Sequence, residues 1–212
     1  MTSNIRVLTH SSIRVEGQKT VVYIDPFEID GAPHDADVVF VTHSHYDHFS
    51  PEDIEKISKA NTILVAPNSM NGETKKAGGL VSKIINVTPG EEPEILGVKF
   101  QVVRAYNTTS QFHKKEADFV GYIINVDGSR IYIAGDTEAN EDNLKVQCDV
   151  ALVPIGGTYT MDAKAAADFV NRLNPKVAIP THYGNIVGDA SAAEEFAKKV
   201  NPGIKVEIKM EK

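Results

Sequence analysis

The chain consists of two halves that repeat one pattern of short apolar segments. In the first half, a segment that ends at Asp25 is followed 12 residues later by Asp37 and a second apolar run. In the second half, a segment that ends at Asp136 is followed 13 residues later by Asp149 and another such run. Two sheet-plus-helix halves of this kind, packed sheet against sheet, would bring both sets of strand ends to one edge. Short strands also resemble one another by chance, so coincidence stays open at this point.

Strand signals dominate each half, and helix signals follow them. Ser50, with proline after it, is typical of a helix cap, and we expect a helix from there to about Ala60. A second helix is predicted over Met161–Leu173, and a capping box at Ser191 opens a third that ends before Asn201. Apolar runs between turn residues predict strands at Ile5–Leu8, Val21–Ile24, Val38–Val41, Thr62–Val65, Ile84–Val87, Val98–Val103, Phe119–Val126, Arg130–Ala134, Val150–Val153, Val177–Ile179 and Ile204–Ile208.

Length and composition exclude several classes of protein. With 212 residues, 42% hydrophobic and 24% charged, we expect one globular domain spanning residues 1–212. No apolar run has the roughly 18 residues of a membrane span, and no secretory signal is recognisable, so a cytoplasmic protein without a membrane partner is predicted. The net charge of −7 argues against nucleic acid as a partner. A single cysteine, Cys148, excludes an internal disulfide and a cysteine-rich zinc site.

The strongest motif follows directly after the apolar run 38–41. It contains His43, His45, Asp47 and His48. Residues alternate sides along an extended backbone, so His43 and His45 point the same way and can share one metal ion. A turn into the helix capped by Ser50 would carry the other two side chains towards a second ion. Chance clustering is the alternative, and three histidines and an aspartate within six residues argue against it.

This His-x-His-x-Asp-His motif resembles that of the metallo-β-lactamase superfamily. Further segments resemble it in the same order, over roughly residues 4 to 185. The chain looks closest to small uncharacterised hydrolases related to the ascorbate-phosphate lactonases. The resemblance implies an α+β fold, a four-layer αββα sandwich of two similar halves. The matching segments are Tyr23-Ile24-Asp25-Pro26-Phe27, Ala134-Gly135-Asp136-Thr137, Val153-Pro154-Ile155-Gly156-Gly157 and Ile179-Pro180-Thr181-His182-Tyr183-Gly184.

The resemblance also implies two divalent metal ions. Zinc is expected first, with Mn²⁺, Fe²⁺ and Ni²⁺ as alternatives. For the third ligand of the first ion, a simple alignment favours Asn107, a poor zinc ligand, whereas His113 is the one histidine in that loop, so both stay open. The implied ligands are His43, His45 and His113 for one ion, Asp47, His48 and His182 for the other, and Asp136 as the bridge.

Several other side chains are candidates for supporting roles. His10 and His34 fit no ligand position, and His10 lies either at the edge of the site or in the core. Asp25 is expected to orient a ligand histidine, since ligand imidazoles usually donate their second N–H to a carboxylate or carbonyl. Tyr159 and Tyr183 could donate to a developing oxyanion, with simple packing as the alternative for each.

These residues predict a metal-dependent hydrolase. Two ions about 3.5–4 Å apart can share a water and lower its pKa, and the resulting hydroxide would attack a small ester, lactone or phosphodiester. Asp47, the first catalytic candidate, would orient the nucleophile or carry its proton, and Tyr183 is the second. The alternatives are a metal-binding protein without catalysis, a nuclease of the superfamily, and an oxidoreductase like the flavodiiron proteins. His45 argues against the oxidoreductase, because the flavodiiron relatives have glutamate at this position of the motif. A small-molecule substrate is the expected partner, and a homo-oligomer stays open.

Overall fold

The chain folds into two β-sheets with helices on their outer faces. The structure is a computed structural model, and it describes residues 2–212. The first sheet contains six strands and the second seven. The strands are β1 (Ile5–Thr9), β2 (Ser12–Glu16), β3 (Val21–Ile24), β4 (Ala36–Phe40), β5 (Ser58–Pro67), β6 (Lys83–Val87), β7 (Glu94–Ile95), β8 (Val98–Arg104), β9 (Val120–Val126), β10 (Ser129–Ile133), β11 (Val150–Pro154), β12 (Val177–Thr181) and β13 (Lys205–Val206).

The two sheets repeat one succession of strand pairings. From β1 to β6, two antiparallel pairs are followed by three parallel ones. From β8 to β13, the same order of two antiparallel and three parallel pairs returns, and β7 adds one strand at the edge. The repeat predicted from the sequence is therefore confirmed in the topology, with Asp25 directly after β3 and Asp136 shortly after β10.

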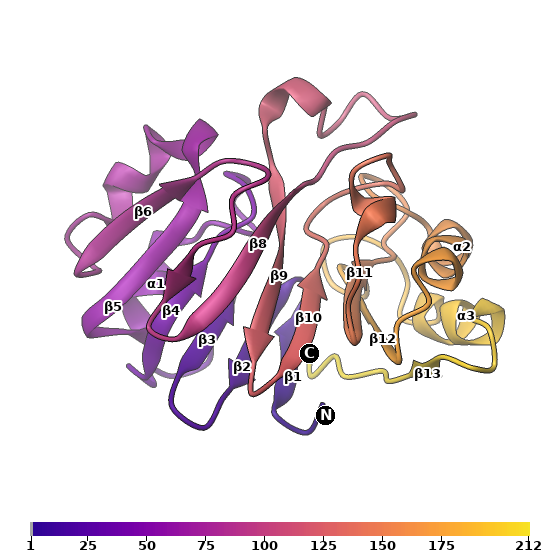
Figure 1. Cartoon of the computed structure of the whole chain (residues 1–212), viewed down its shortest axis with the longest axis horizontal. Helices are drawn as coiled ribbons and strands as arrows, with labels where there is room; N and C mark the ends of the chain where they lie inside the picture. Colours follow the sequence, from indigo (N-terminus) through magenta and orange to yellow (C-terminus); the bar gives the residue numbers. More distant parts are fainter. Residues whose placement is uncertain (1) are drawn as a thin grey trace.

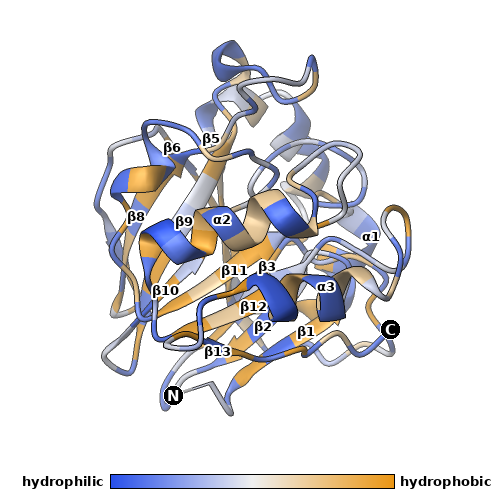
Figure 2. Ribbon diagram, turned by 90° about the vertical axis from the view of Figure 1, so that its right-hand side faces the viewer, coloured by the Kyte–Doolittle hydropathy of each residue, from blue (hydrophilic) through white to orange (hydrophobic). Residues whose placement is uncertain are grey.

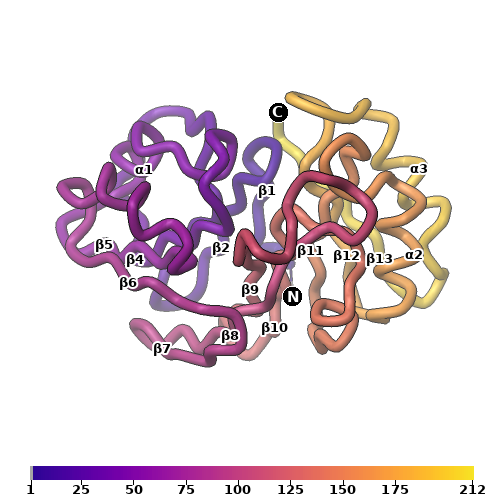
Figure 3. Tube along the Cα trace, turned by 90° about the horizontal axis from the view of Figure 1, so that it is seen from above, coloured from indigo at the N-terminus to yellow at the C-terminus, as the bar shows by residue number. Residues whose placement is uncertain are grey.

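The layers follow from which face of each strand is apolar. Alternate residues of both sheets, such as Val38 and Phe40 of β4 with Tyr122 and Ile124 of β9, point inward and form the core between the sheets. Figure 1 shows α2 (Ala163–Leu173) with α3 (Ala192–Lys199) outside the second sheet. Helix α1 (Pro51–Ile57) packs Ile54 and Ile57 against the face of the first sheet that is turned away from the core between the sheets. Separate apolar clusters lie under each set of helices. The predicted αββα sandwich is thus confirmed, and Figure 3 shows its halves side by side.

The helix boundaries agree with the sequence in part. Ser50 caps α1 as predicted, since its hydroxyl accepts from the Asp53 N–H. The expected end at Ala60 is wrong, because α1 ends at Ile57 and the chain enters β5 at once. The Thr62 hydroxyl holds this turn beside β4, accepting from the Lys59 N–H and donating to a β4 carbonyl.

The other two helices begin differently from the prediction. Asp162 caps α2 through the Ala165 N–H, so the helix starts two residues after Met161. The capping box at Ser191 is wrong: its side chain makes no cap bond, and the Asp189 carboxylate accepts from the Ser191 N–H instead. Figure 2 shows α2 and α3 in front of β11 and β12, and Phe169 of α2 and Phe196 of α3 belong to the apolar cluster that these strands share.

Strand β2 was not anticipated as a separate element. Ile13 and Val15 enter the core between the sheets, but Arg14 and Glu16 point outward, so charges interrupt the apolar run. Four 3-10 turns complete the described chain: Asn68–Met70, Glu73–Ala77, Lys115–Ala117 and Asn143–Lys145. Across residues 2–212, no helix combines the length and the apolar character that a membrane span requires.

Candidate metal centre

The histidine motif is held in place by Asp25, which is fully buried at the end of β3. Its carboxylate accepts from the Thr42 backbone N–H and the Thr42 hydroxyl, each at 2.7 Å. The same carboxylate lies 2.7 Å from His48 Nδ1. A hydrogen bond there leaves His48 Nε2 as the ring atom that faces the site. Asp25 therefore orients His48, as the sequence predicted.

A first donor set joins the motif to the loop after β8. His43 Nε2 lies 3.0 Å from His45 Nδ1, which lies 3.3 Å from His113 Nε2. Thr42 Oγ1 is 3.0 Å from His43 Nδ1, and the backbone carbonyl of Tyr159 is 3.2 Å from His113 Nδ1. These contacts occupy the second ring nitrogen of His43 and of His113. Both rings therefore present Nε2 to the same point.

A second donor set contains one histidine more than the sequence predicted. Asp47, His48 and His182 come together as expected, and His10 joins them. All four donor atoms lie within 4.8 Å of one another. His10 is fully buried, its Nε2 lies 3.1 Å from Asp47 Oδ2, and its ring centroid is 3.9 Å from that of His182.

Asp136 lies between the two donor sets. Its Oδ2 is 3.4 Å from His113 Nε2 in the first set and 3.1 Å from His182 Nε2 in the second. Its Oδ1 is 3.3 Å from His48 Nε2. Gly135 precedes it with φ +65°, and a Cβ there would lie 2.8 Å from a backbone oxygen of Val120, so glycine is needed for this approach. One carboxylate is thus within reach of both sets.

The backbone around the site is strained. His10, Asp25, His113 and His182 all have left-handed conformations, with φ between 46° and 58°. Residues other than glycine rarely adopt this region, and such strain collects at functional sites. The His182 N–H donates to the His10 carbonyl at 2.8 Å, so the two strained positions hold each other.

The charges of the site fit a cation. Burial alone would raise the pKa of Asp136, but the surrounding His182, His48 and His43 hold it well below its usual range. Burial would lower the pKa of His48, yet Asp136 and Asp25 raise it to about 9. His48 Nε2 and Asp136 Oδ1 face each other without hydrogen-bond geometry, and neither has a hydrogen-bond partner within residues 2–212. Imidazole nitrogens and carboxylates are ligands that zinc and related divalent ions accept.

Asn107 and His113 lie in the same loop after β8, and their side chains make different contacts. The Asn107 N–H donates to the His113 carbonyl at 2.8 Å, which closes the loop and returns His113 to the site. The Asn107 amide nitrogen donates to the Tyr159 carbonyl at 2.7 Å, and its Oδ1 is buried without a hydrogen-bond partner among residues 2–212. His113 Nε2 therefore lies among the donor atoms of the first set, and its role as the third ligand stays a prediction.

The remaining candidates are two tyrosines and an outlying histidine. Tyr183 packs in the apolar cluster under α2 and α3, where burial raises the pKa of its phenol. Its catalytic role stays a prediction. His34 lies outside the site, with Nδ1 2.8 Å from the carbonyl of Ser58. Tyr159 reaches the site through its backbone carbonyl, and its side chain is 37% exposed.

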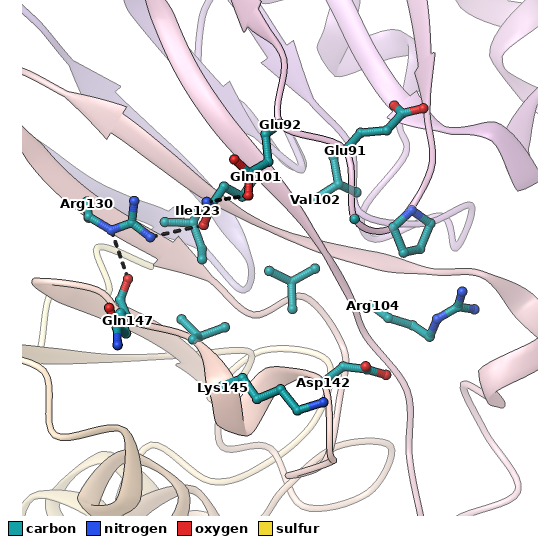
Figure 4. A pocket seen from close by; sticks show the side chains of 14 residues that line it. Glu91, Glu92, Gln101, Val102, Arg104, Ile123, Arg130, Asp142, Lys145 and Gln147 are labelled. Carbon is teal, nitrogen blue, oxygen red and sulfur yellow. Dashed lines mark hydrogen bonds between the residues drawn. The ribbon is translucent and has the colours of Figure 1, made fainter.

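A groove of about 620 Å³ lies elsewhere, on the outer face of β8 and β9 (Figure 4). Its side chains include Arg130, which donates to Gln101 and to the Gln147 carbonyl. Arg104 pairs with Asp118 at the other end. No histidine lines this groove, so it is separate from the metal-ligand cluster.

Known proteins share this sequence and fold. A family model described as a beta-lactamase superfamily domain matches residues 4–182. A UPF0173 metal-dependent hydrolase of Pyrococcus abyssi is 34% identical over 194 residues, covering 84% of each chain. A solved structure from Parabacteroides distasonis is 28% identical with a TM-score of 0.79, covering 97% of this chain and 91% of the other. The metallo-beta-lactamase fold protein YhfI of Bacillus subtilis, 10% identical, gives a TM-score of 0.75 over 96% of this chain and 94% of its own. The chain therefore belongs to the metallo-β-lactamase superfamily, and within it to the metal-dependent hydrolases.

Proposed function

We propose that this hydrolase uses two divalent ions, zinc first, to cleave a small ester, lactone or phosphodiester. The observation that carries the proposal is the position of Asp136, whose carboxylate lies within 3.4 Å of His113 on one side and 3.1 Å of His182 on the other. A carboxylate between two imidazole sets suits a pair of cations, because its negative charge can offset the positive charge of both. His43, His45 and His113 would hold one ion, and Asp47, His48 and His182 the other.

The bound ions would supply an activated water and a polarised substrate oxygen. The chain's own residues then have distinct tasks. Asp25 and the Tyr159 carbonyl fix the ring orientations of His48 and His113. Burial acts to raise the pKa of Asp47, but the hydrogen bond with His10 lowers it to about 2. Asp47 is therefore ionised at neutral pH and can orient the nucleophile by accepting a hydrogen bond from it.

A small-molecule substrate is the proposed partner. The net charge of −7 disfavours a nucleic acid, whose phosphates attract basic proteins. A nuclease of the superfamily and a metal-binding protein without catalysis remain the alternatives that experiment must separate from the proposal.

A substrate screen on metal-quantified protein tests this function. Zinc-loaded and manganese-loaded protein would be assayed with p-nitrophenyl esters, lactones and bis-p-nitrophenyl phosphate, beside Asp136→Ala and the outlying control His34→Ala. We expect hydrolysis of at least one class by the wild type and by His34→Ala, and loss of metal and activity together in Asp136→Ala. Full metal content without turnover of any class would favour the non-catalytic alternative, and an RNA mobility shift would favour the nuclease.

A further inference from the structure

Two pairs of aromatic side chains stand beside the metal-ligand cluster. Phe27 and Tyr46 form one pair, with ring centroids 6.0 Å apart and planes at 75°. Phe112 and Tyr159 form the other, at 4.8 Å and 85°. Both are edge-to-face contacts of the kind that aromatic rings favour. We call these four residues the aromatic rim.

Each pair is tied to metal-ligand residues by the chain itself. Tyr46 lies between His45 and Asp47 in the sequence, and Phe112 directly precedes His113. The Tyr159 carbonyl lies 3.2 Å from His113 Nδ1. His45 and His113, the sequence neighbours of Tyr46 and Phe112, have ring nitrogens 3.3 Å apart, and the Phe27 ring centroid lies 6.4 Å from that of His10 in the second set. The aromatic rim therefore lies next to the donor sets rather than elsewhere on the surface.

The rim is unusually exposed for its size. Tyr46 is 67% exposed, Phe112 51% and Tyr159 37%. Among residues 2–212 only two other large apolar side chains are as open to solvent, Leu96 and Ile208, and neither belongs to the segments of the donor sets. Exposed apolar surface gathered at a polar centre marks a binding site, because water leaves such surface favourably when a ligand covers it.

The segments that carry the rim contain no cation of their own, although Lys114 directly follows His113 and Lys212 Nζ lies 3.2 Å from the Glu28 carbonyl, where it pairs with Asp30. Residues 25–29, 44–50, 107–113, 157–161 and 184–190 contain no lysine or arginine. A second anionic group on the substrate, away from the scissile bond, would find no charged partner on these segments. A neutral ring would find aromatic faces and edges. The composition of the rim thus favours an apolar substrate body.

We propose that the substrate carries a neutral aromatic group, which packs against the aromatic rim while its scissile bond lies at the donor sets. The proposal rests on the hydrolase function above and narrows its substrate class. It assigns specificity to Tyr46 and Phe112, the two most exposed members. It disfavours substrates whose distal group is a phosphate or a second carboxylate, because the rim segments themselves carry no lysine or arginine.

Binding of product-like carboxylates tests the rim without requiring turnover. Zinc-loaded protein would be titrated by calorimetry with acetate, phenylacetate and succinate, which share one carboxylate and differ in the distal group. We expect phenylacetate to bind at least about tenfold more tightly than acetate, and succinate no more tightly than acetate. Tyr46→Ala and Phe112→Ala should remove most of the preference for phenylacetate over acetate. Leu96→Ala should keep this preference, and it serves as an exposed apolar control in the turn between β7 and β8.

Each result has a defined meaning. The proposal would be overturned if acetate and phenylacetate bind equally or if neither binds. It would also be overturned if the preference for phenylacetate survives both Tyr46→Ala and Phe112→Ala. Light scattering would show whether a second copy covers the rim: a dimer that Phe112→Ala converts to a monomer would also overturn it. Zinc content and thermal unfolding of each variant exclude misfolding. If phenylacetate binds preferentially but no ester is hydrolysed, the role of the aromatic rim is supported and the proposed function is wrong. If esters are cleaved without a preference for an aromatic ring, the proposed function is supported and the role of the rim is wrong.

Discussion

His10 and Asp47 meet inside the molecule, with His10 Nε2 3.1 Å from Asp47 Oδ2, although 37 residues separate them. Burial lowers the pKa of His10, so the ring is neutral near pH 7 and its N–H donates to the carboxylate. The His10 carbonyl at the same time accepts from the His182 N–H. His10, in the turn between β1 and β2, therefore positions both Asp47 and His182 of the second donor set.

Replacing His10 should weaken one metal position more than the other. In His10→Ala the Asp47 carboxylate loses its orienting partner, and loss of such a partner typically lowers metal affinity about 10–100-fold. The amide of His10→Gln can still donate to Asp47, and that variant should recover part of the loss. Competition with a chromophoric chelator measures both affinities. His34→Ala is the matched control, and unchanged affinity of both ions in His10→Ala would remove the role assigned to this contact.

The third ligand of the first ion is tested by a pair of substitutions in one loop. His113→Ala should lower the zinc content by up to one equivalent per chain, because His113 is the one imidazole that this loop brings to the first donor set. Asn107→Ala should keep both equivalents, since the amide contacts the Tyr159 carbonyl instead. Elemental analysis of dialysed protein gives the content. Full zinc in His113→Ala, or its loss only in Asn107→Ala, would reverse the assignment.

Gly156 should tolerate no side chain. A Cβ there would collide with the His182 carbonyl and lie 2.7 Å from Val187 Cγ2. We expect Gly156→Ala to lower the free energy of unfolding by about 1–3 kcal/mol, the usual cost of overpacking. Gly72→Ala is the control, because nothing lies within 4 Å of its Cβ position and its backbone is helical. Urea unfolding of metal-free protein compares them, and equal stability of the two variants would contradict this reading.

Glu207 should contribute stability that disappears in acid. Burial acts to raise its pKa, but contacts with Lys205, Thr2 and Lys209 lower it from 4.5 to about 2. A carboxyl whose pKa falls on folding stabilises the protein above its unfolded value, and this contribution is lost as the pH drops from about 4.5 towards 2. Glu207→Gln should therefore be less stable than wild type by about 1 kcal/mol at pH 7, with the gap narrowing below pH 4.5. Urea unfolding across this range checks it, and a gap independent of pH would argue against the ionised carboxylate.

The architecture could be predicted from the sequence because it depends on local patterns of residues. The repeat after Asp25 and Asp136 and the Ser50 cap depend on neighbouring residues and chain direction, which are readable without a structure. The same holds for the shared side of His43 and His45, which follows from strand alternation.

What the sequence could not show depends on long-range contacts and backbone turns. His10 joins the site only because a left-handed turn, with φ 47°, aims it at Asp47. Tyr183 follows His182, whose φ of 58° turns the chain after β12, and the Tyr183 side chain packs in the apolar cluster under α2 and α3. Asn107 and His113 could not be separated because the loop that orders them closes through the carbonyl of Tyr159, 46 residues away from His113.

A metal titration tests the two-ion account most directly. Metal-free protein would be titrated with Zn²⁺, and hydrolysis of the best substrate from the screen would be measured at each ratio. The account predicts that bound zinc and activity rise together to a plateau at two equivalents per chain, and that Asp136→Ala lacks both. Activity that persists in metal-free protein, or a plateau at one equivalent that Asp136→Ala leaves unchanged, would contradict it.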